Sequence, residues 1–201
     1  MTSNPPKKIV ICISGMAGSG KSTVAVKVAK KYSLRYFSGG DALKSMAMEM
    51  GYAPKERGWW ESAEGIKFLT KRMQDPSFDK KIDERLLTWA REGNVVLDSW
   101  TMPWLFDQGF KIWLEASKEE RARRISKRDK TSFKEALSAL EKKETKTKII
   151  YKKLYGFNLG EDFSPFDLVL DVNHLRPDGV FNTISLVLDS AFEIRGYTID
   201  H

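Results

Sequence analysis

The stretch Ile9-Val-Ile-Cys-Ile-Ser-Gly-Met-Ala-Gly-Ser-Gly-Lys-Ser-Thr23 decides the fold of this chain. The apolar, mostly β-branched run Ile9 to Ile13 predicts a buried strand. The spacing G-x-x-x-x-G-K-[ST] follows from Gly15 to Ser22, and an apolar stripe at helical spacing comes after it. A strand, a glycine-rich loop and a helix in this order predict a P-loop, which is a turn that binds phosphate groups.

The residue types of the loop explain how it holds a nucleoside triphosphate. Glycines let the backbone turn its N–H groups towards an anion at the positive end of a helix. Lys21 adds a mobile charge for the β- and γ-phosphates, and the Ser22 hydroxyl is suited to ligate Mg²⁺. We therefore expect ATP and Mg²⁺ as ligands, with ATP held by Gly15, Ala17, Gly18, Ser19, Gly20, Lys21, Ser22 and Thr23.

Length and composition limit the remaining possibilities. A chain of 201 residues suits one domain, and no apolar run approaches the roughly 20 residues of a membrane span. The lead Pro5-Pro6-Lys7-Lys8 is polar, unlike a signal peptide, and a single cysteine, Cys12, indicates a reducing cytoplasm. The net charge of +7 favours anionic ligands, but lysine-rich helix faces are usually only solvated, so we do not expect nucleic acid or a membrane as a partner. We expect a monomer or a weak dimer.

Five short apolar segments alternate with amphipathic helical patterns, which predicts an α/β fold. The expected strands are 9–13, 34–37, 94–97, 110–114 and 167–171. This alternation implies a parallel sheet with helices on both faces, the three-layer α/β/α arrangement of P-loop NTPases. Ligands of such sheets gather at the carboxyl ends of the strands, where Asp41 and Asp98 are expected.

The same pattern favours a small kinase among P-loop proteins. The base-recognition motif Asn-Lys-x-Asp of GTPases is absent, and the chain is short for a motor. A kinase needs a second phosphate site, and the segment Gly40 to Lys44 is the candidate, although Asp41 also fits a plain helix N-cap. Asp98 is suited to hold Mg²⁺ through water or to accept a proton from the acceptor.

Arginines and tryptophans supply the other candidates for the site. Arg121, Arg124 and Arg128 lie along one helix face, so we expect Arg121 and Arg124 to bind ATP, and Arg124 and Arg128 to act as catalytic cations. A solvated helix face is the alternative for these arginines. Trp59 is a candidate for stacking on the acceptor base, and Trp100 for a second acceptor contact.

The chain resembles the archaeal-type cytidylate kinases of the nucleoside monophosphate kinase group. The matching segments are Ile13–Ala25, Tyr36-Phe-Ser-Gly-Gly-Asp41, Val95-Val-Leu-Asp98, Lys111–Ala116, Glu120-Arg-Ala-Arg-Arg-Ile125, Tyr151-x-x-x-Tyr-Gly-Phe157 and Phe166–Asp171. The resemblance spans nearly the whole chain and is weakest between residues 51 and 79. It implies transfer of the γ-phosphoryl group of ATP to CMP or dCMP.

The resemblance also implies a division of a single domain, residues 1–201. A core at 7–40, 94–124 and 156–195 would carry an acceptor-binding helical insertion at about 41–92 and a helical lid at about 125–150. The sequence departs from the family on the acceptor side. Lys44 stands where the family usually has an arginine, Asp98-Ser-Trp100 lacks the arginine expected soon after the third strand, and Ile150 replaces a lid arginine.

These departures leave the acceptor open. The lid cations must then be Arg124, Arg128, Lys143 or Lys146, or the transfer differs from that of the family. Within the same class, AMP, UMP or a metabolite outside the nucleotides remains an alternative acceptor. From other classes, a P-loop ATPase stimulated by nucleic acid and a nucleotide-binding regulator without transfer activity remain.

Overall fold

The computed structural model describes residues 8–54 and 58–195, and the polar lead at residues 5–7 lies outside them. The strands in this part of the chain are β1 Val10–Ser14, β2 Arg35–Ser38, β3 Val95–Asp98, β4 Phe110–Glu115 and β5 Leu168–Asp171. The helices are α1 Lys21–Lys31, α2 Gly39–Glu49, the 3-10 helix η1 Trp59–Glu61, α3 Ala63–Gln74, α4 Ser77–Glu92, α5 Met102–Leu105, α6 Lys118–Asp129, α7 Phe133–Tyr155 and α8 Pro177–Arg195.

The five strands form one parallel sheet in the order β2-β3-β1-β4-β5. β1 lies at its centre, with Val10 opposite Val95 of β3 and Ile11 opposite Phe110 of β4. Every residue of β1 and β3 is buried, which explains why both read as continuous apolar runs. The expected P-loop NTPase fold with five parallel strands is confirmed.

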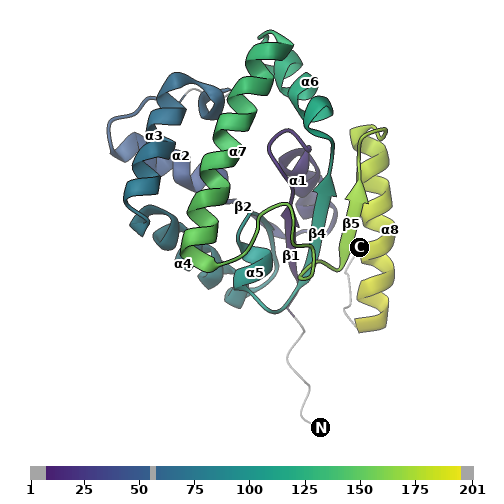
Figure 1. Cartoon of the computed structure of the whole chain (residues 1–201). Helices are drawn as coiled ribbons and strands as arrows, with labels where there is room; N and C mark the ends of the chain where they lie inside the picture. Colours follow the sequence, from purple (N-terminus) through teal and green to yellow (C-terminus); the bar gives the residue numbers. More distant parts are fainter. Residues whose placement is uncertain (1–7, 55–57, 196–201) are drawn as a thin grey trace.

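Helices cover both faces of the sheet (Figure 1). α1 and α8 pack against one face, where Ile11 of β1 joins Val28 and Ile184 in the larger apolar core. α4 and α5 cover the other face, where Cys12 of β1 joins Leu86 and Met102. The three layers fix the carboxyl ends of β1 and β3 side by side.

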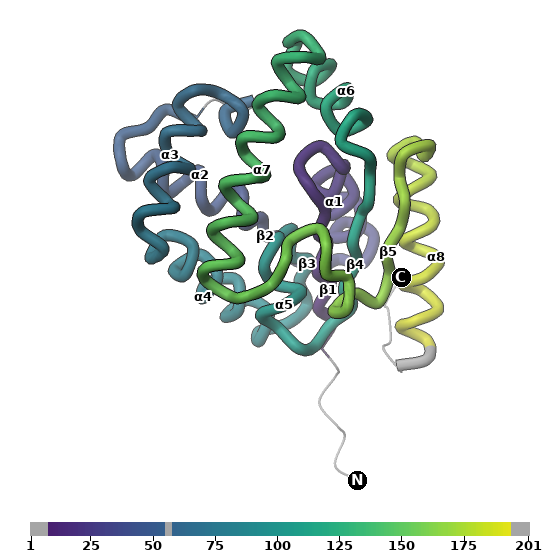
Figure 2. The backbone as a smooth tube through the Cα atoms, in the orientation of Figure 1, coloured from purple at the N-terminus to yellow at the C-terminus, as the bar shows by residue number. Residues whose placement is uncertain are grey.

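Two helical excursions leave this core and meet again beside the sheet. The chain forms α2, η1, α3 and α4 between β2 and β3, and it forms α6 and α7 between β4 and β5. The long helix α7 packs along α3, as Figure 2 shows, and it also contacts η1. These are the segments in which the sequence suggests an acceptor-binding insertion and a lid.

Two helix starts differ from the expectation, because the residue pattern predicts Asp41 as an N-cap of the first helix and Asp79 as the N-cap of the second. Asp41 does not cap α2, because the Ser38 side chain accepts the hydrogen bond from the Asp41 backbone N–H at 3.2 Å. α4 begins at Ser77, and the Asp79 carboxylate accepts from Arg72 at 3.1 Å instead of capping the helix. Both aspartates therefore lie within a first helical turn, and both line the cavity described below.

Candidate active site

The loop between β1 and α1 is a tight turn that requires its glycines. φ is positive at Gly15, Gly18 and Gly20, at 149°, 81° and 95°. A Cβ on Gly15 would lie 2.6 Å from the carbonyl oxygen of Leu114, and one on Gly18 would lie 2.8 Å from that of Arg121. A side chain at either position would collide with the backbone of β4 or α6.

The same loop has the donor groups that a phosphate chain needs. Gly20 caps α1 without a side-chain hydrogen bond, and a Cβ there would meet no atom within 4 Å, so the helix start faces open space. The buried Ser19 hydroxyl has no hydrogen-bond partner among the described residues. Lys21 and Ser22 follow in the first turn. Helix N–H groups, a hydroxyl and an ammonium group on the wall of one cavity are the components of an anion site.

A cavity of about 600 Å³ lies beside this loop. Its walls come from the P-loop, the tip of β3, the start of α2, and parts of α3, α4, α6 and α7. Of the residues predicted from the sequence, it brings together Ala17, Gly18, Ser19, Gly20, Lys21, Ser22, Thr23, Gly40, Asp41, Lys44, Asp98, Trp100, Arg124 and Arg128. Gly15, Trp59 and Arg121 do not belong to its walls.

Asp98 and Trp100 lie where β3 ends. Asp98 is buried and accepts a hydrogen bond from the Tyr36 hydroxyl at 3.2 Å. The Trp100 indole N–H donates to the carbonyl of Gly15 at 2.6 Å, and Lys21 Nζ lies 5.3 Å from the centroid of the Trp100 ring. Trp100 is therefore fixed against the phosphate loop on the cavity wall, and its expected contact with the acceptor stays a prediction.

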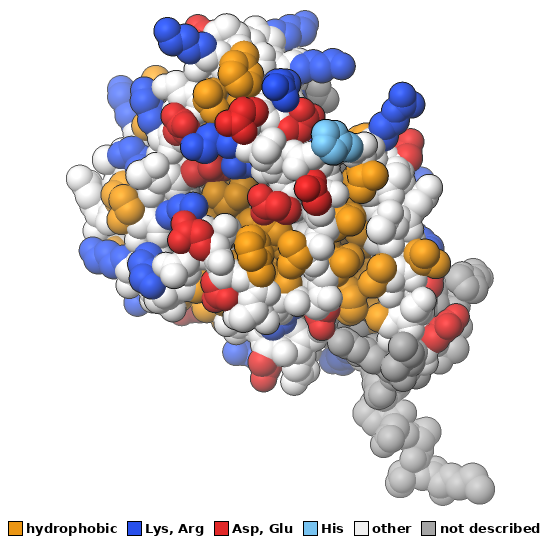
Figure 3. Space-filling view, turned by 45° about the vertical axis from the view of Figure 1, so that its right-hand side comes forward, with side chains coloured by type: hydrophobic (Ala, Val, Ile, Leu, Met, Phe, Trp, Pro, Cys, Tyr) orange, Lys and Arg blue, Asp and Glu red, His pale blue; other side chains and the backbone are white. Residues whose placement is uncertain are grey.

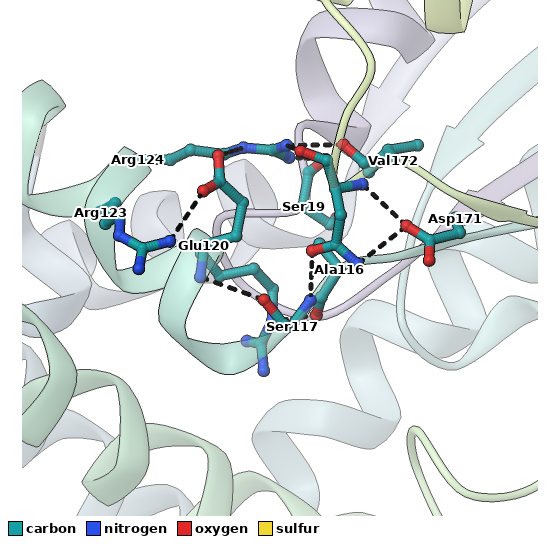
Figure 4. A network of polar contacts seen from close by, with 10 residues as sticks. Ser19, Ala116, Ser117, Glu120, Arg123, Arg124, Asp171 and Val172 are labelled. Carbon is teal, nitrogen blue, oxygen red and sulfur yellow. Dashed lines mark hydrogen bonds and ion pairs between the residues drawn. The ribbon is translucent and has the colours of Figure 1, made fainter.

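Arg124 connects the P-loop to the loop after β5 (Figure 4). Its guanidinium donates to Glu120 at 3.1 Å, to the Ser19 carbonyl at 3.3 Å and to the Val172 carbonyl at 2.6 Å. Most of its N–H groups are thus engaged by the protein. What remains available to a ligand in the cavity is mainly the flat face of the guanidinium, which suits stacking on a base better than gripping phosphate oxygens.

A second cationic group bridges the two helical excursions. Glu61 of η1 accepts from Lys143 Nζ of α7 at 2.8 Å and from Arg128 of α6 at 3.3 Å. Burial acts to raise the pKa of Glu61, but Lys143 and Arg128 hold it below its usual value. Burial lowers the pKa of Lys143, an effect that Glu61 opposes. These charges lie on the cavity wall, and the sequence alone did not indicate Glu61.

Arg121 has a structural position rather than the ATP-binding one expected from its helix face. It is buried, donates to the carbonyls of Ala116 at 3.0 Å and Ala17 at 3.1 Å, and forms an ion pair with Glu144 of α7. A buried guanidinium must be paired in this way. Arg121 thus supports the P-loop from outside the cavity.

The acceptor side also differs from expectation at the tryptophans. Trp59 is 3% exposed, packs against Ala47 and Phe68, and donates from its indole N–H to Glu64 at 2.6 Å. It is a core residue because it follows Gly58 into the 3-10 turn and faces α3. The neighbouring Trp60 lines the cavity instead.

The cavity wall also carries a buried polar cluster that was not predicted from the sequence. Arg72 of α3 holds Asp79 of α4, and Asp83 of α4 accepts hydroxyl hydrogen bonds from Thr101 at 2.5 Å and Tyr155 at 2.6 Å. The usable signal was the helical period: Asp79 and Asp83 share the buried stripe of α4 with Ile82, Leu86 and Ala90. A charged residue on an apolar stripe must find a buried partner or a ligand.

The described residues contain no group of three or more His, Cys, Asp or Glu side chains that could hold a metal ion. Ser22 and Asp98 line one cavity next to the phosphate loop. A hydroxyl and a carboxylate fit Mg²⁺, which is usually bound by few protein ligands together with substrate phosphates and water.

Comparison with known proteins assigns the family. The sequence matches the profile of the cytidylate kinase-like family over residues 10–174. The chain belongs to the cytidylate kinase-like family. The cytidylate kinase of Ignicoccus hospitalis is 37% identical over 181 residues, covering 89% of this chain and 98% of that protein. That of Methanocaldococcus jannaschii is 35% identical over 187 residues, covering 90% and 98%.

Solved structures resemble this family member in fold. Shikimate kinase from Bacteroides thetaiotaomicron superposes with a TM-score of 0.57 at 12% identity, covering 91% of this chain and 99% of its own. Deoxyadenosine kinase from M. mycoides with bound dATP gives 0.52 at 16% identity, covering 90% and 100%. The expected family and fold are both confirmed.

Proposed function

We propose that this protein transfers the γ-phosphoryl group of ATP to CMP or dCMP, giving ADP and CDP or dCDP. The observation that carries the proposal is a cavity that joins a complete P-loop to a buried polar cluster suited to a second ligand. The relatives named cytidylate kinase, similar over nearly their whole length, support CMP as that ligand.

The donor half of the site holds ATP. The loop from Ala17 to Thr23 binds the phosphates through backbone N–H groups, and Lys21 neutralises the β- and γ-phosphates. The face of Arg124 stacks on the adenine. Ser22 and Asp98 are the residues that would hold Mg²⁺, which when bound neutralises charge that develops on the phosphate oxygens.

The acceptor half places a phosphate against the donor. An oxygen of the CMP phosphate forms the new P–O bond as the bond between the γ-phosphorus and the β–γ bridging oxygen breaks. That oxygen is largely ionised near neutral pH, since the second pKa of a phosphate monoester is about 6. Asp98 therefore has no proton to remove, and of its two predicted roles we retain the metal contact.

Gly40, Asp41 and Lys44 at the start of α2 form the site for the acceptor phosphate, with Lys44 supplying positive charge. Lys143 is the lid cation that would contact the transferred group. Its Nζ lies 5.8 Å from the centroid of the Trp100 ring, which Lys21 Nζ also approaches at 5.3 Å. Two ammonium groups near one ring, one of them buried, repel each other, and an anionic phosphoryl group between them would remove that repulsion.

The remaining proposals concern the setting of the enzyme. In the described part of the chain, no helix is long and apolar enough to cross a membrane. We propose a cytoplasmic enzyme that acts on free nucleotides as a monomer or a weak dimer and has no nucleic-acid partner.

A panel of acceptors tests the proposed function. ADP release from ATP and Mg²⁺ is measured with CMP, dCMP, UMP, AMP, GMP and shikimate under identical conditions. We expect the highest kcat/KM with CMP or dCMP. No turnover with either cytidine nucleotide would remove the proposal, and turnover with shikimate alone would indicate a non-nucleotide kinase.

A further inference from the structure

Glu61 joins the two helical excursions through charges that line the cavity. One of its carboxylate oxygens accepts from Lys143 Nζ of α7 at 2.8 Å, and the other accepts from Arg128 of α6 at 3.3 Å. The side chains of Glu61 and Lys143 are only 10% and 11% exposed, so water and salt screen their attraction little. Both cations and the P-loop Lys21 belong to the same cavity wall as Glu61.

The backbone that carries Glu61 is anchored. The 3-10 helix η1 packs Trp59 into the core, and the Glu61 N–H donates to the carbonyl of Gly58 at 3.2 Å. Trp60 of the same turn lines the cavity, with its ring centroid 5.5 Å from Lys143 Nζ. A carboxylate on a short anchored turn has less freedom than the longer side chains that it binds, so it determines where their charged ends lie.

Lys143 depends on this carboxylate to stay charged. Burial lowers the pKa of Lys143, Glu61 opposes that effect, and Lys21 and Arg128 add to it. Three cations that share one cavity wall repel one another. Without Glu61, the buried ammonium group would release its proton at a lower pH or turn away from the cavity.

Charged groups on the elements around Lys143 have partners of their own. They are Arg72 with Asp79, Glu144 with Arg121, and Arg128 with Asp129 as well as with Glu61. In the part of the chain that the structure describes, the ion pair of Lys143 is the one with Glu61. The charge state of Lys143 therefore depends mainly on Glu61.

We propose that Glu61 is a positioning residue for phosphoryl transfer, which holds Lys143 and Arg128 towards the phosphoryl group as it moves from donor to acceptor. The inference rests on the proposed function, but only on the transfer from ATP and not on the identity of the acceptor. Glu61 acts through the two cations, whose direction it sets before the anion arrives. Charge that is already oriented stabilises the transition state without a cost of reorganisation at the moment of reaction.

The pH dependence of kcat tests this role. Wild type and Glu61→Gln are compared with CMP at saturating ATP and Mg²⁺, between about pH 6 and about pH 10. Glu61→Gln should lower kcat at neutral pH by about 10-fold or more, with KM for ATP within about 3-fold. Its decline in kcat at alkaline pH should begin about one pH unit or more below that of wild type, because loss of an opposite charge favours the neutral amine.

Two more variants assign that decline to Lys143. Glu61→Gln combined with Lys143→Arg carries a guanidinium that stays charged over the whole range, so the displaced alkaline decline should disappear. Glu61→Asp keeps the charge but is one methylene shorter. It should lower kcat by about 3-fold or more and move the alkaline decline in the same direction by less, and it decides the test if Glu61→Gln folds poorly.

Glu64→Gln is the matched control. Glu64 lies three residues further along the chain and accepts from the Trp59 indole N–H at 2.6 Å and from the Ala53 N–H at 3.2 Å, outside the cavity wall. A glutamine keeps an oxygen acceptor for either contact. The kcat of this variant and its pH profile should match those of wild type.

The outcomes separate this inference from the proposed function. If Glu61→Gln lowers kcat equally at every pH, or if Glu61→Asp has the wild-type profile, Glu61 is only a structural tie and the inference is wrong. A higher kcat or a lower KM for ATP in Glu61→Gln also overturns it, since the carboxylate would then compete with phosphate. If wild type uses only another acceptor, the proposed acceptor fails, and the same variants test Glu61 with that acceptor. No transfer to any acceptor would contradict both.

Discussion

Lys143 is the single residue of α7 whose charge the phosphoryl transfer depends on most in this account. It is buried at the junction of α7, η1 and the P-loop, and it approaches the rings of Trp60 at 5.5 Å and Trp100 at 5.8 Å. The next candidate on the same helix, Lys146, contacts the Thr70 hydroxyl at 3.2 Å and does not belong to the cavity wall. The two lysines thus form a natural comparison.

Replacing Lys143 with Met should lower kcat by about 100-fold, since preorganised charge at a developing anion contributes a factor of that order. KM for ATP should change by less than about 3-fold, because the P-loop is intact. Steady-state kinetics of Lys143→Met, Lys143→Arg and the control Lys146→Met measure this. Partial recovery with Arg and near-normal activity of Lys146→Met are expected; equal losses for both Met variants would argue against the role of Lys143.

Asp83 gives the fold a measurable pH dependence. Burial raises its pKa to about 6; Asp79 adds to the rise, while Thr101, Tyr155 and Arg72 oppose it. An acid whose pKa is higher in the folded state contributes stability at low pH, and that contribution is lost as the pH rises through the folded pKa.

The unfolding free energy of Asp83→Asn minus that of wild type should therefore increase between about pH 4 and about pH 7, by on the order of 2 kcal/mol. Urea denaturation of both proteins across this range measures the difference. Relative to wild type, the neutral variant Asp83→Asn would then be more stable at neutral pH than at acid pH. A difference in unfolding free energy that does not vary with pH would contradict a raised pKa of Asp83 in the folded protein.

At the scale of residues, the sequence predicted the members of the P-loop and missed the buried charged cluster of α3 and α4. The P-loop spacing fixes its own geometry locally, so Gly18, Lys21 and Ser22 could be placed from sequence alone. Arg72 and Asp83 line one cavity only because α3 packs beside α4, a tertiary contact that spacing does not encode. Trp59 was misplaced for the same reason, since its burial depends on α3.

At the scale of elements, the helices α6 and α7 support the P-loop on the side away from the cavity. Arg121 of α6 joins Glu144 of α7 and also donates to the Ala17 carbonyl. Ser132 begins α7 with a reciprocal capping box with Glu135, as its sequence pattern predicts. α7 then runs 23 residues to Tyr155, which carries Lys143 and Tyr151 to the cavity.

Removing only Arg121 from the ion pair with Glu144 should lower the stability of the fold, whereas replacing both residues with apolar ones should not. Arg121→Met should lower the unfolding free energy by about 3–5 kcal/mol, because it leaves Glu144 buried and unpaired. Arg121→Met combined with Glu144→Leu should recover most of that loss and keep measurable kinase activity. Chemical denaturation and ATP titration measure both properties. A single variant with normal stability and lost ATP affinity would restore the cofactor-binding role predicted from the sequence.

At the scale of the whole molecule, the sheet brings residues distant in sequence to one edge. Alternating apolar runs and helices predicted the parallel sheet and its layers, since both patterns are periodic along the chain. The packing of α7 against α3 and η1 was not predictable in detail. It depends on contacts between side chains of two segments that are far apart in the sequence. On the face drawn in Figure 3, basic side chains are interspersed with acidic ones. This mixture fits solvated helix faces and does not favour the alternative of an ATPase stimulated by nucleic acid.

The most direct measurement follows the phosphoryl group itself. ATP labelled on its γ-phosphorus is incubated with Mg²⁺, CMP and the wild-type protein, and the nucleotides are separated. We predict that the label appears in CDP as ADP accumulates in equal amount, and that Lys21→Ala, folded but lacking the P-loop ammonium, transfers none above background. Label released as inorganic phosphate with no labelled CDP, or full transfer by Lys21→Ala, would contradict the account.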